Sequence, residues 1–144
     1  MIERHPIPRR PARAAAMLAA LALAACASAD PTPETGPRSA LGEAEAILFE
    51  VTAETGPREG PNTFAITLHA AEDAAPLEDA ALEVRAHMPA MAHGTPGDPA
   101  VEALGEGRYR ALDVVFSMPG TWELHLSAST GALADDATFL YEVP

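Results

Sequence analysis

Residues 62–70 read NTFAITLHA, and hydrophobic and polar side chains alternate along this stretch almost without a break. The hydrophobic residues Phe64, Ile66 and Leu68 share one parity, whereas Thr63 and His69 share the other. A period of two residues is typical of a strand that buries one face and exposes the other. The stretch therefore predicts a half-buried β-strand.

Residues 121–128, TWELHLSA, repeat this pattern, with Trp122 and Leu124 expected to point inward and Glu123 and His125 outward. Other short alternating runs lie between clusters of Gly, Pro and Asp, and no later stretch shows a sustained helical period. The predicted strands are 44–53, 62–70, 80–88, 99–104, 108–116, 121–128 and 137–143. This pattern predicts an all-β domain, an immunoglobulin-like or fibronectin-like antiparallel β-sandwich of about seven strands.

The N-terminal segments follow one another in the order that is typical of an export signal. Four arginines in the first 13 residues precede an uncharged apolar run over residues 14–25, and Cys26 follows directly. This run of about a dozen residues is shorter than the roughly 20 that a helix needs to cross a membrane. Residues 1–25 are therefore predicted to be a signal peptide.

The end of the signal reads LAAC at residues 23–26 and resembles the bacterial lipobox, in which the cysteine receives diacylglycerol. This resemblance implies lipidation at Cys26, which would anchor the exported protein in the bacterial envelope, facing the periplasm. It also explains a single unpaired cysteine in an exported chain. The alternative is ordinary cleavage after the small residues 27–29, ASA.

Residues 26–43 are rich in Pro, Ala, Ser, Thr and Gly and are predicted to form a flexible tether, with the sandwich domain at 44–144. Residues 26–144 contain five arginines, no lysine and 20 acidic residues. Such a surface repels phosphate backbones, so nucleic acid is excluded as a partner. The chain also lacks a nucleophile elbow, a nucleotide loop and a zinc-protease motif, and we expect no enzyme activity.

Two segments contain every methionine beyond the signal: residues 85–94, RAHMPAMAHG, and residues 116–122, FSMPGTW. Thioether and imidazole groups are suitable ligands for Cu(I). If the strands alternate in direction, the loops after the third and fifth predicted strands meet at one pole of the sandwich. The candidate metal ligands are Met91, His93 and Met118, with Met88 or His87.

Two further histidines are left out of this candidate site. His69 is expected at the opposite pole. His125 lies about four residues beyond the second turn, which is roughly 13 Å at the rise of a strand.

A structural interpretation of the same residues stays open. Met88 shares the parity of the inward residues of its strand, and Met118 continues the parity of Phe116. Both methionines could therefore belong to the core, where methionine is common. His87 alternates outward and could be a solvated surface side chain.

The motifs together resemble the YtkA-like domain, which is related to FixH. They are GPxxGxNxF at residues 56–64, MPxMxHG at 88–94, GxY at 107–109 and FxMPGxW at 116–122. The resemblance implies an immunoglobulin-like sandwich in a bacterial envelope protein, often a lipoprotein, with a suspected role in copper handling or oxidase assembly.

The sequence thus leads to two hypotheses. The first is an envelope lipoprotein that binds Cu(I) for buffering or for delivery to another metal-handling envelope protein. The second is a metal-free interaction or scaffolding module, in which the Met-Pro turns are purely structural.

Overall fold

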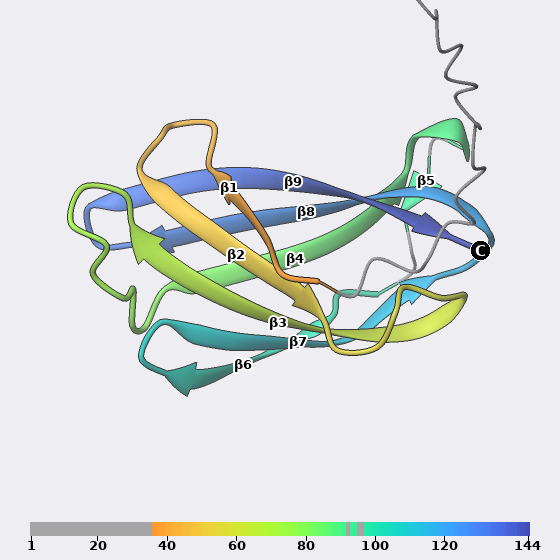
Figure 1. Ribbon diagram of the computed structural model, residues 1–144, viewed down its shortest axis with the longest axis horizontal. Coiled ribbons are helices and arrows are strands. Elements are labelled where there is room, and N and C mark those ends of the chain that lie inside the picture. The colour runs from red at the N-terminus through yellow and green to blue at the C-terminus, as the bar shows by residue number, and fades with distance from the viewer. Residues whose placement is uncertain (1–35, 92, 95–96) are drawn as a thin grey trace, which may run out of the picture.

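The computed structural model describes residues 36–91, 93–94 and 97–144, and for His93 the backbone alone. Within these residues the chain forms nine strands and one short 3-10 turn. The strands make two antiparallel sheets that pack face to face (Figure 1). This arrangement confirms the predicted β-sandwich. No helix of the described residues has the length and apolarity needed to cross a membrane.

The first sheet has five strands, in the order β1 (Arg38–Leu41), β2 (Ile47–Ala53), β3 (Gly60–Ala70), β7 (Arg108–Phe116) and β6 (Ala100–Gly105). The second has four, in the order β5 (His93–Gly94), β4 (Ala81–Met88), β8 (Gly120–Thr130) and β9 (Leu133–Val143). The turn η1 (Pro89–Met91) joins β4 to β5. The chain therefore changes sheet after β3, after β5 and after β7, so β4 pairs with β8 although 31 residues separate Met88 from Gly120 along the chain.

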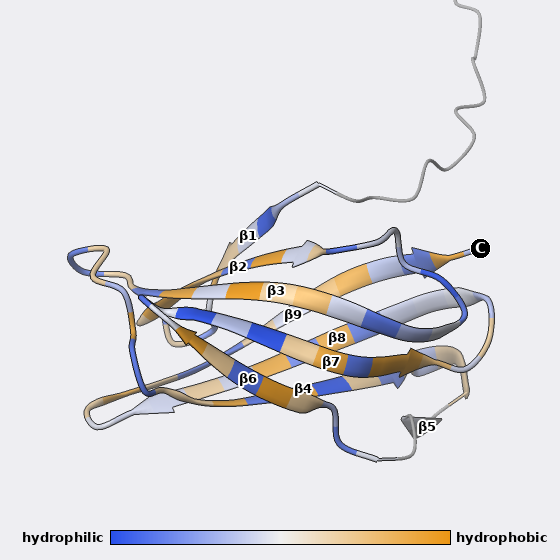
Figure 2. Ribbon diagram, turned by 90° about the horizontal axis from the view of Figure 1, so that it is seen from below, coloured by the Kyte–Doolittle hydropathy of each residue, from blue (hydrophilic) through white to orange (hydrophobic). Residues whose placement is uncertain are grey.

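The core lies between the two sheets, and the predicted inward faces of β3 and β8 are confirmed. Phe64 and Trp122 are 0% and 1% exposed. Aromatic rings connect the sheets, with centroids 5.2 Å apart between Phe64 and Tyr141 and 5.2 Å apart between Phe116 and Trp122. Figure 2 shows that hydrophobic and hydrophilic segments both occur along β6 and β7.

The sandwich begins earlier than the sequence predicts. Arg38–Leu41, which fall in the predicted tether, form the edge strand β1 and pair with β2. The guanidinium of Arg38 lies 4.8 Å from the centroid of the Tyr141 ring and donates a hydrogen bond to the carbonyl oxygen of Leu140. The strand is therefore held by contacts with the other sheet, whereas its own four residues lack a strong alternating pattern.

A buried carboxylate holds the turn between β1 and β2. Asp135 is 3% exposed, and its two oxygens accept hydrogen bonds from the backbone N–H groups of Ala44, Ala46, Ile47 and Asp136 at 2.7–2.9 Å. Burial by itself would raise the pKa of Asp135, but the four N–H donors together outweigh it and lower the pKa below its usual value. The negative charge of Asp135 thus fixes the turn that connects β1 to β2.

The ends of β4 and β7 lie at the same pole of the sandwich (Figure 1). The turn η1 contacts β8, and the methyl carbon of Met88 lies close to Gly120 at the start of β8. The two methionine-containing segments are therefore neighbours in space.

Candidate metal centre

The outer face of the four-stranded sheet brings two histidines and a glutamate together. His87 on β4 lies directly opposite Glu123 on β8, and His125 is two residues further along β8, opposite Arg85. The neighbouring inward residues Met88 and Leu124 are buried at 4% and 0% exposure. Strand alternation therefore places all three polar side chains on the outer face.

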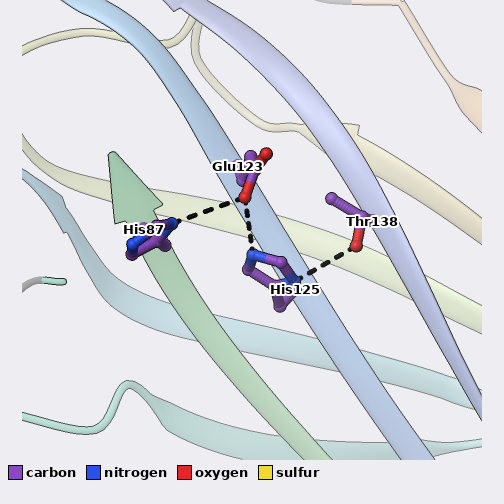
Figure 3. A network of polar contacts seen from close by, with 4 residues as sticks. All are labelled: His87, Glu123, His125 and Thr138. Atoms are coloured by element: carbon purple, nitrogen blue, oxygen red, sulfur yellow. Dashed lines mark hydrogen bonds and ion pairs between the residues drawn. The ribbon is translucent and has the colours of Figure 1, made fainter. Parts of the chain in front are cut away.

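The three side chains point toward one another (Figure 3). Oε2 of Glu123 lies 2.9 Å from Nε2 of His125 and 3.4 Å from Nδ1 of His87. The two imidazole rings are 6.1 Å apart between centroids, with an interplanar angle of 59°. One potential ligand atom from each residue falls within 4.8 Å of the other two. This spacing is small enough for one metal ion to contact all three.

The centre is open to solvent. The side chains of His87, Glu123 and His125 are 40%, 28% and 46% exposed. A groove of about 590 Å³ lies beside His87 and His125 and extends over Thr138 on β9 toward Glu83 on β4. An ion held here could exchange with molecules in solution, because the sheet covers it from one side.

The donor set suits a divalent transition metal. Imidazole nitrogen binds Zn, Cu, Fe and Ni, and a carboxylate supplies a harder oxygen ligand. Structural zinc sites have four protein ligands, whereas three protein ligands leave a fourth position open to water or another ligand. The geometry therefore allows reversible binding of a divalent ion.

The residues predicted from the sequence have different environments. His87 belongs to the cluster. Met88 is buried, Met118 is partly buried and packs against the core, and Met91 is 50% exposed in η1. The backbone of His93 pairs with that of Met88 in the β4–β5 ladder. Binding of one ion by Met91, His93 and Met118 stays a prediction, and Cys26 with the signal lies outside the described residues.

The metal ligands predicted from the sequence do not include Glu123 or His125, although strand alternation predicts that both side chains point outward from one strand and that His87 points outward from another. The distance of His125 from the turn at the pole argues only against a site at that pole. The cluster instead lies on the sheet face, and the pairing of β4 with β8 brings its members together.

The model of the YtkA-like family matches residues 43–127, which is more than half of the chain. The chain belongs to the YtkA-like family. The matched residues include β4, β5 and β7 and all three members of the cluster. The resemblance deduced from the Met-Pro and glycine motifs is thereby confirmed.

A solved structure shares the fold. A crystal structure of FetP from uropathogenic E. coli strain F11, recombinantly expressed in the E. coli periplasm, is similar with a TM-score of 0.50 and 8% sequence identity. The match covers 77% of this chain and 94% of FetP. At this identity the similarity establishes the shared β-sandwich alone. No curated protein matches the chain.

Proposed function

We propose that this YtkA-like protein is an exported lipoprotein of the bacterial envelope that binds a copper ion at His87, Glu123 and His125. The observation that supports the proposal is the convergence of one ligand atom from each residue within 4.8 Å on an open sheet face. The export signal and the LAAC stretch at residues 23–26 support the location. The role would be buffering or delivery, because a half-exposed ion with a free coordination position can be passed on.

The ligands favour Cu(II) at this centre. Among divalent first-row ions, Cu(II) forms the most stable complexes with nitrogen and oxygen ligands, and Zn(II) follows below it. The thioethers that led to the Cu(I) prediction are not part of the cluster, and Met88 is buried in the core. A Cu(I) site at Met91, His93 and Met118 is a separate proposal for the neighbouring pole.

The second candidate function is a metal-free interaction module. The burial of Met88 at 4% exposure supports it, because this methionine has a packing role that needs no metal. Met118 packs against the same core, and its carbonyl oxygen accepts the indole N–H of Trp122 at 3.0 Å. A scaffolding protein would retain these contacts with no ion bound.

Competition titration separates the two functions. The mature protein, extracted from membranes in detergent, should withdraw Cu(II) from a chromophoric chelator. His125→Ala and Glu123→Gln should each weaken this binding more than about 10–100-fold, the loss typical of changing a residue that only supports a ligand. His69→Ala is the matched control, since His69 also lies near a glutamate, 3.8 Å from Glu50, but on the other sheet. Absence of competition by the wild-type protein would favour the metal-free module.

A further inference from the structure

Thr138 contacts the side of the His125 ring that faces away from Glu123 (Figure 3). Its Oγ1 lies 3.1 Å from Nδ1 of His125, and the backbone register places the two residues directly opposite each other on β9 and β8. Nε2 of the same ring lies 2.9 Å from Oε2 of Glu123. The ring of His125 is thus held at both nitrogens, by Glu123 on its own strand β8 and by Thr138 on the neighbouring strand β9.

The hydrogen bonds assign the proton on this ring when no metal is bound. An ionised carboxylate can only accept, so Nε2 of His125 must donate its N–H to Glu123. In the neutral imidazole Nδ1 is then an acceptor, and it accepts a hydrogen bond from the hydroxyl group of Thr138. The threonine hydroxyl acts as a donor in this state.

With an ion bound at the cluster, Nδ1 of His125 would become the hydrogen-bond donor and the hydroxyl oxygen of Thr138 the acceptor. Nε2 is the nitrogen that faces Glu123, so it is the atom that would bind the metal, and it must lose its proton. A neutral imidazole then holds its proton on Nδ1, which needs an acceptor. The oxygen of Thr138 is already within hydrogen-bond distance, and its own proton can turn to water because Thr138 is exposed.

We infer that Thr138 is a positioning residue for the metal centre, and that its hydroxyl selects Nε2 of His125 as the metal ligand by accepting the N–H of Nδ1. This inference rests on the proposed function. Histidine ligands commonly donate the N–H of their second ring nitrogen to a carboxylate, a backbone carbonyl or water, which fixes the tautomer and the orientation of the ring. The hydroxyl oxygen of Thr138 is an acceptor in the corresponding place. A hydroxyl suits the position because it can donate to the free ring and accept from the metal-bound ring, whereas a carbonyl could only accept.

The alternative role for Thr138 is that of an ordinary exposed strand residue. Threonine is favoured in strands, and an exposed hydrogen bond contributes little to folding. If Thr138 had only that role, its replacement by the β-branched valine would leave metal binding unchanged. The two roles therefore differ in what the hydroxyl does for the ion, and stability alone does not distinguish them.

The test uses the mature protein labelled with ¹⁵N-histidine and loaded with Zn(II), a diamagnetic probe of the same ligands. Long-range ¹H–¹⁵N spectra should show the metal on Nε2 of His125 and a proton on Nδ1. Thr138→Val should lower Zn(II) and Cu(II) affinity by roughly 10–100-fold, and Thr138→Ser should restore it. Thr67→Val, on β3 of the other sheet, is the matched control.

The outcomes separate the inference from the proposed function. Failure of the wild-type protein to bind either ion overturns both. Wild-type binding with unchanged affinity in Thr138→Val, or no restoration by serine, overturns the inference alone. Metal on Nδ1 of His125 in the wild-type spectrum also overturns it, and this measurement needs no variant. If Thr138→Val does not fold, Thr138→Ala removes the same hydroxyl.

Discussion

The methyl carbon of Met88 packs against Gly120, where β4 ends and β8 begins. A Cβ added to Gly120 would lie 2.6 Å from Cε of Met88, which is closer than two carbon atoms can approach without a shift. The φ angle of Gly120 is +132°, a value that is essentially restricted to glycine. The absence of a side chain at Gly120 leaves room for the end of the Met88 side chain.

Gly120→Ala should therefore destabilise the domain by about 1–3 kcal/mol, chiefly because a residue with a side chain is strained at this backbone angle, and also because the end of the Met88 side chain must shift. Chemical denaturation of the purified protein measures the effect. Gly36→Ala is the control, because a Cβ at Gly36 meets nothing within 4 Å. Equal midpoints for Gly120→Ala and the wild type would show that the β7–β8 turn has a different conformation.

Trp122→Ala should cost roughly 3–5 kcal/mol, because it removes a large side chain that is 1% exposed and packs against Phe116. This is a large share of the stability of a small domain. His125→Ala, on the opposite face of the same strand, should change the free energy of unfolding by less than about 0.5 kcal/mol without metal. A similar loss in both variants would contradict the inward and outward faces of β8.

The strands could be predicted because their signal is local. Each half-buried strand alternates within itself, so Phe64 and Trp122 reveal their inward faces without knowledge of any partner. β1 could not be found in this way, because four residues with mixed character become a strand only through pairing with β2 and the contact of Arg38 with Tyr141. Tertiary contacts of this kind override weak local preference.

The cluster of His87, Glu123 and His125 was harder to predict because its members come from strands that are distant in sequence. Alternation places His87, Glu123 and His125 outward, but it does not state that β4 pairs with β8 or in which register. Register decides that His87 faces Glu123, and a shift of one residue would separate them. The methionines also favour a site at the pole of the sandwich, whereas the cluster lies on the sheet face.

Asp135→Asn should reveal an electrostatic contribution that depends on pH. The folded pKa of Asp135 lies below its unfolded value, so its stabilisation is fully present above the unfolded pKa of about 3.9 and is lost as the pH falls through the folded pKa. Asparagine presents an N–H₂ group to backbone donors that need an acceptor. We expect a cost of about 1–3 kcal/mol at neutral pH.

Denaturation at several pH values checks this expectation. The wild type should lose more stability than Asp135→Asn below about pH 4. The plots of the free energy of unfolding against pH for the two proteins should therefore converge at low pH. Asp136→Asn, at the exposed neighbouring position, is the control and should keep the acid dependence of the wild type. Parallel curves for the wild type and Asp135→Asn would contradict the role of the buried charge.

Lipidation at Cys26 predicts a mature N-terminus at this residue with a lipid mass added. Mass spectrometry of the protein extracted from membranes measures both features. Cys26→Ser should move the protein to the soluble envelope fraction, because the apolar run at 14–25 is too short for a membrane span. A mature N-terminus at Asp30 without lipid would support ordinary cleavage after residues 27–29.

Metal binding should stabilise the folded protein, because the cluster joins β4 to β8 only when both strands are in register. An ion at 100 times its Kd adds about 2.7 kcal/mol to the free energy of unfolding. Cu(II) and Zn(II) should therefore raise Tm, a chelator should reverse the rise, and His87→Ala should abolish it. Met91→Leu preserves the volume of an exposed side chain and should retain the full rise with Cu(II). If Met91→Leu instead lost the rise while His87→Ala kept it, the ion would be held by the sulfur ligands at the pole, and the histidine cluster would be a polar surface feature.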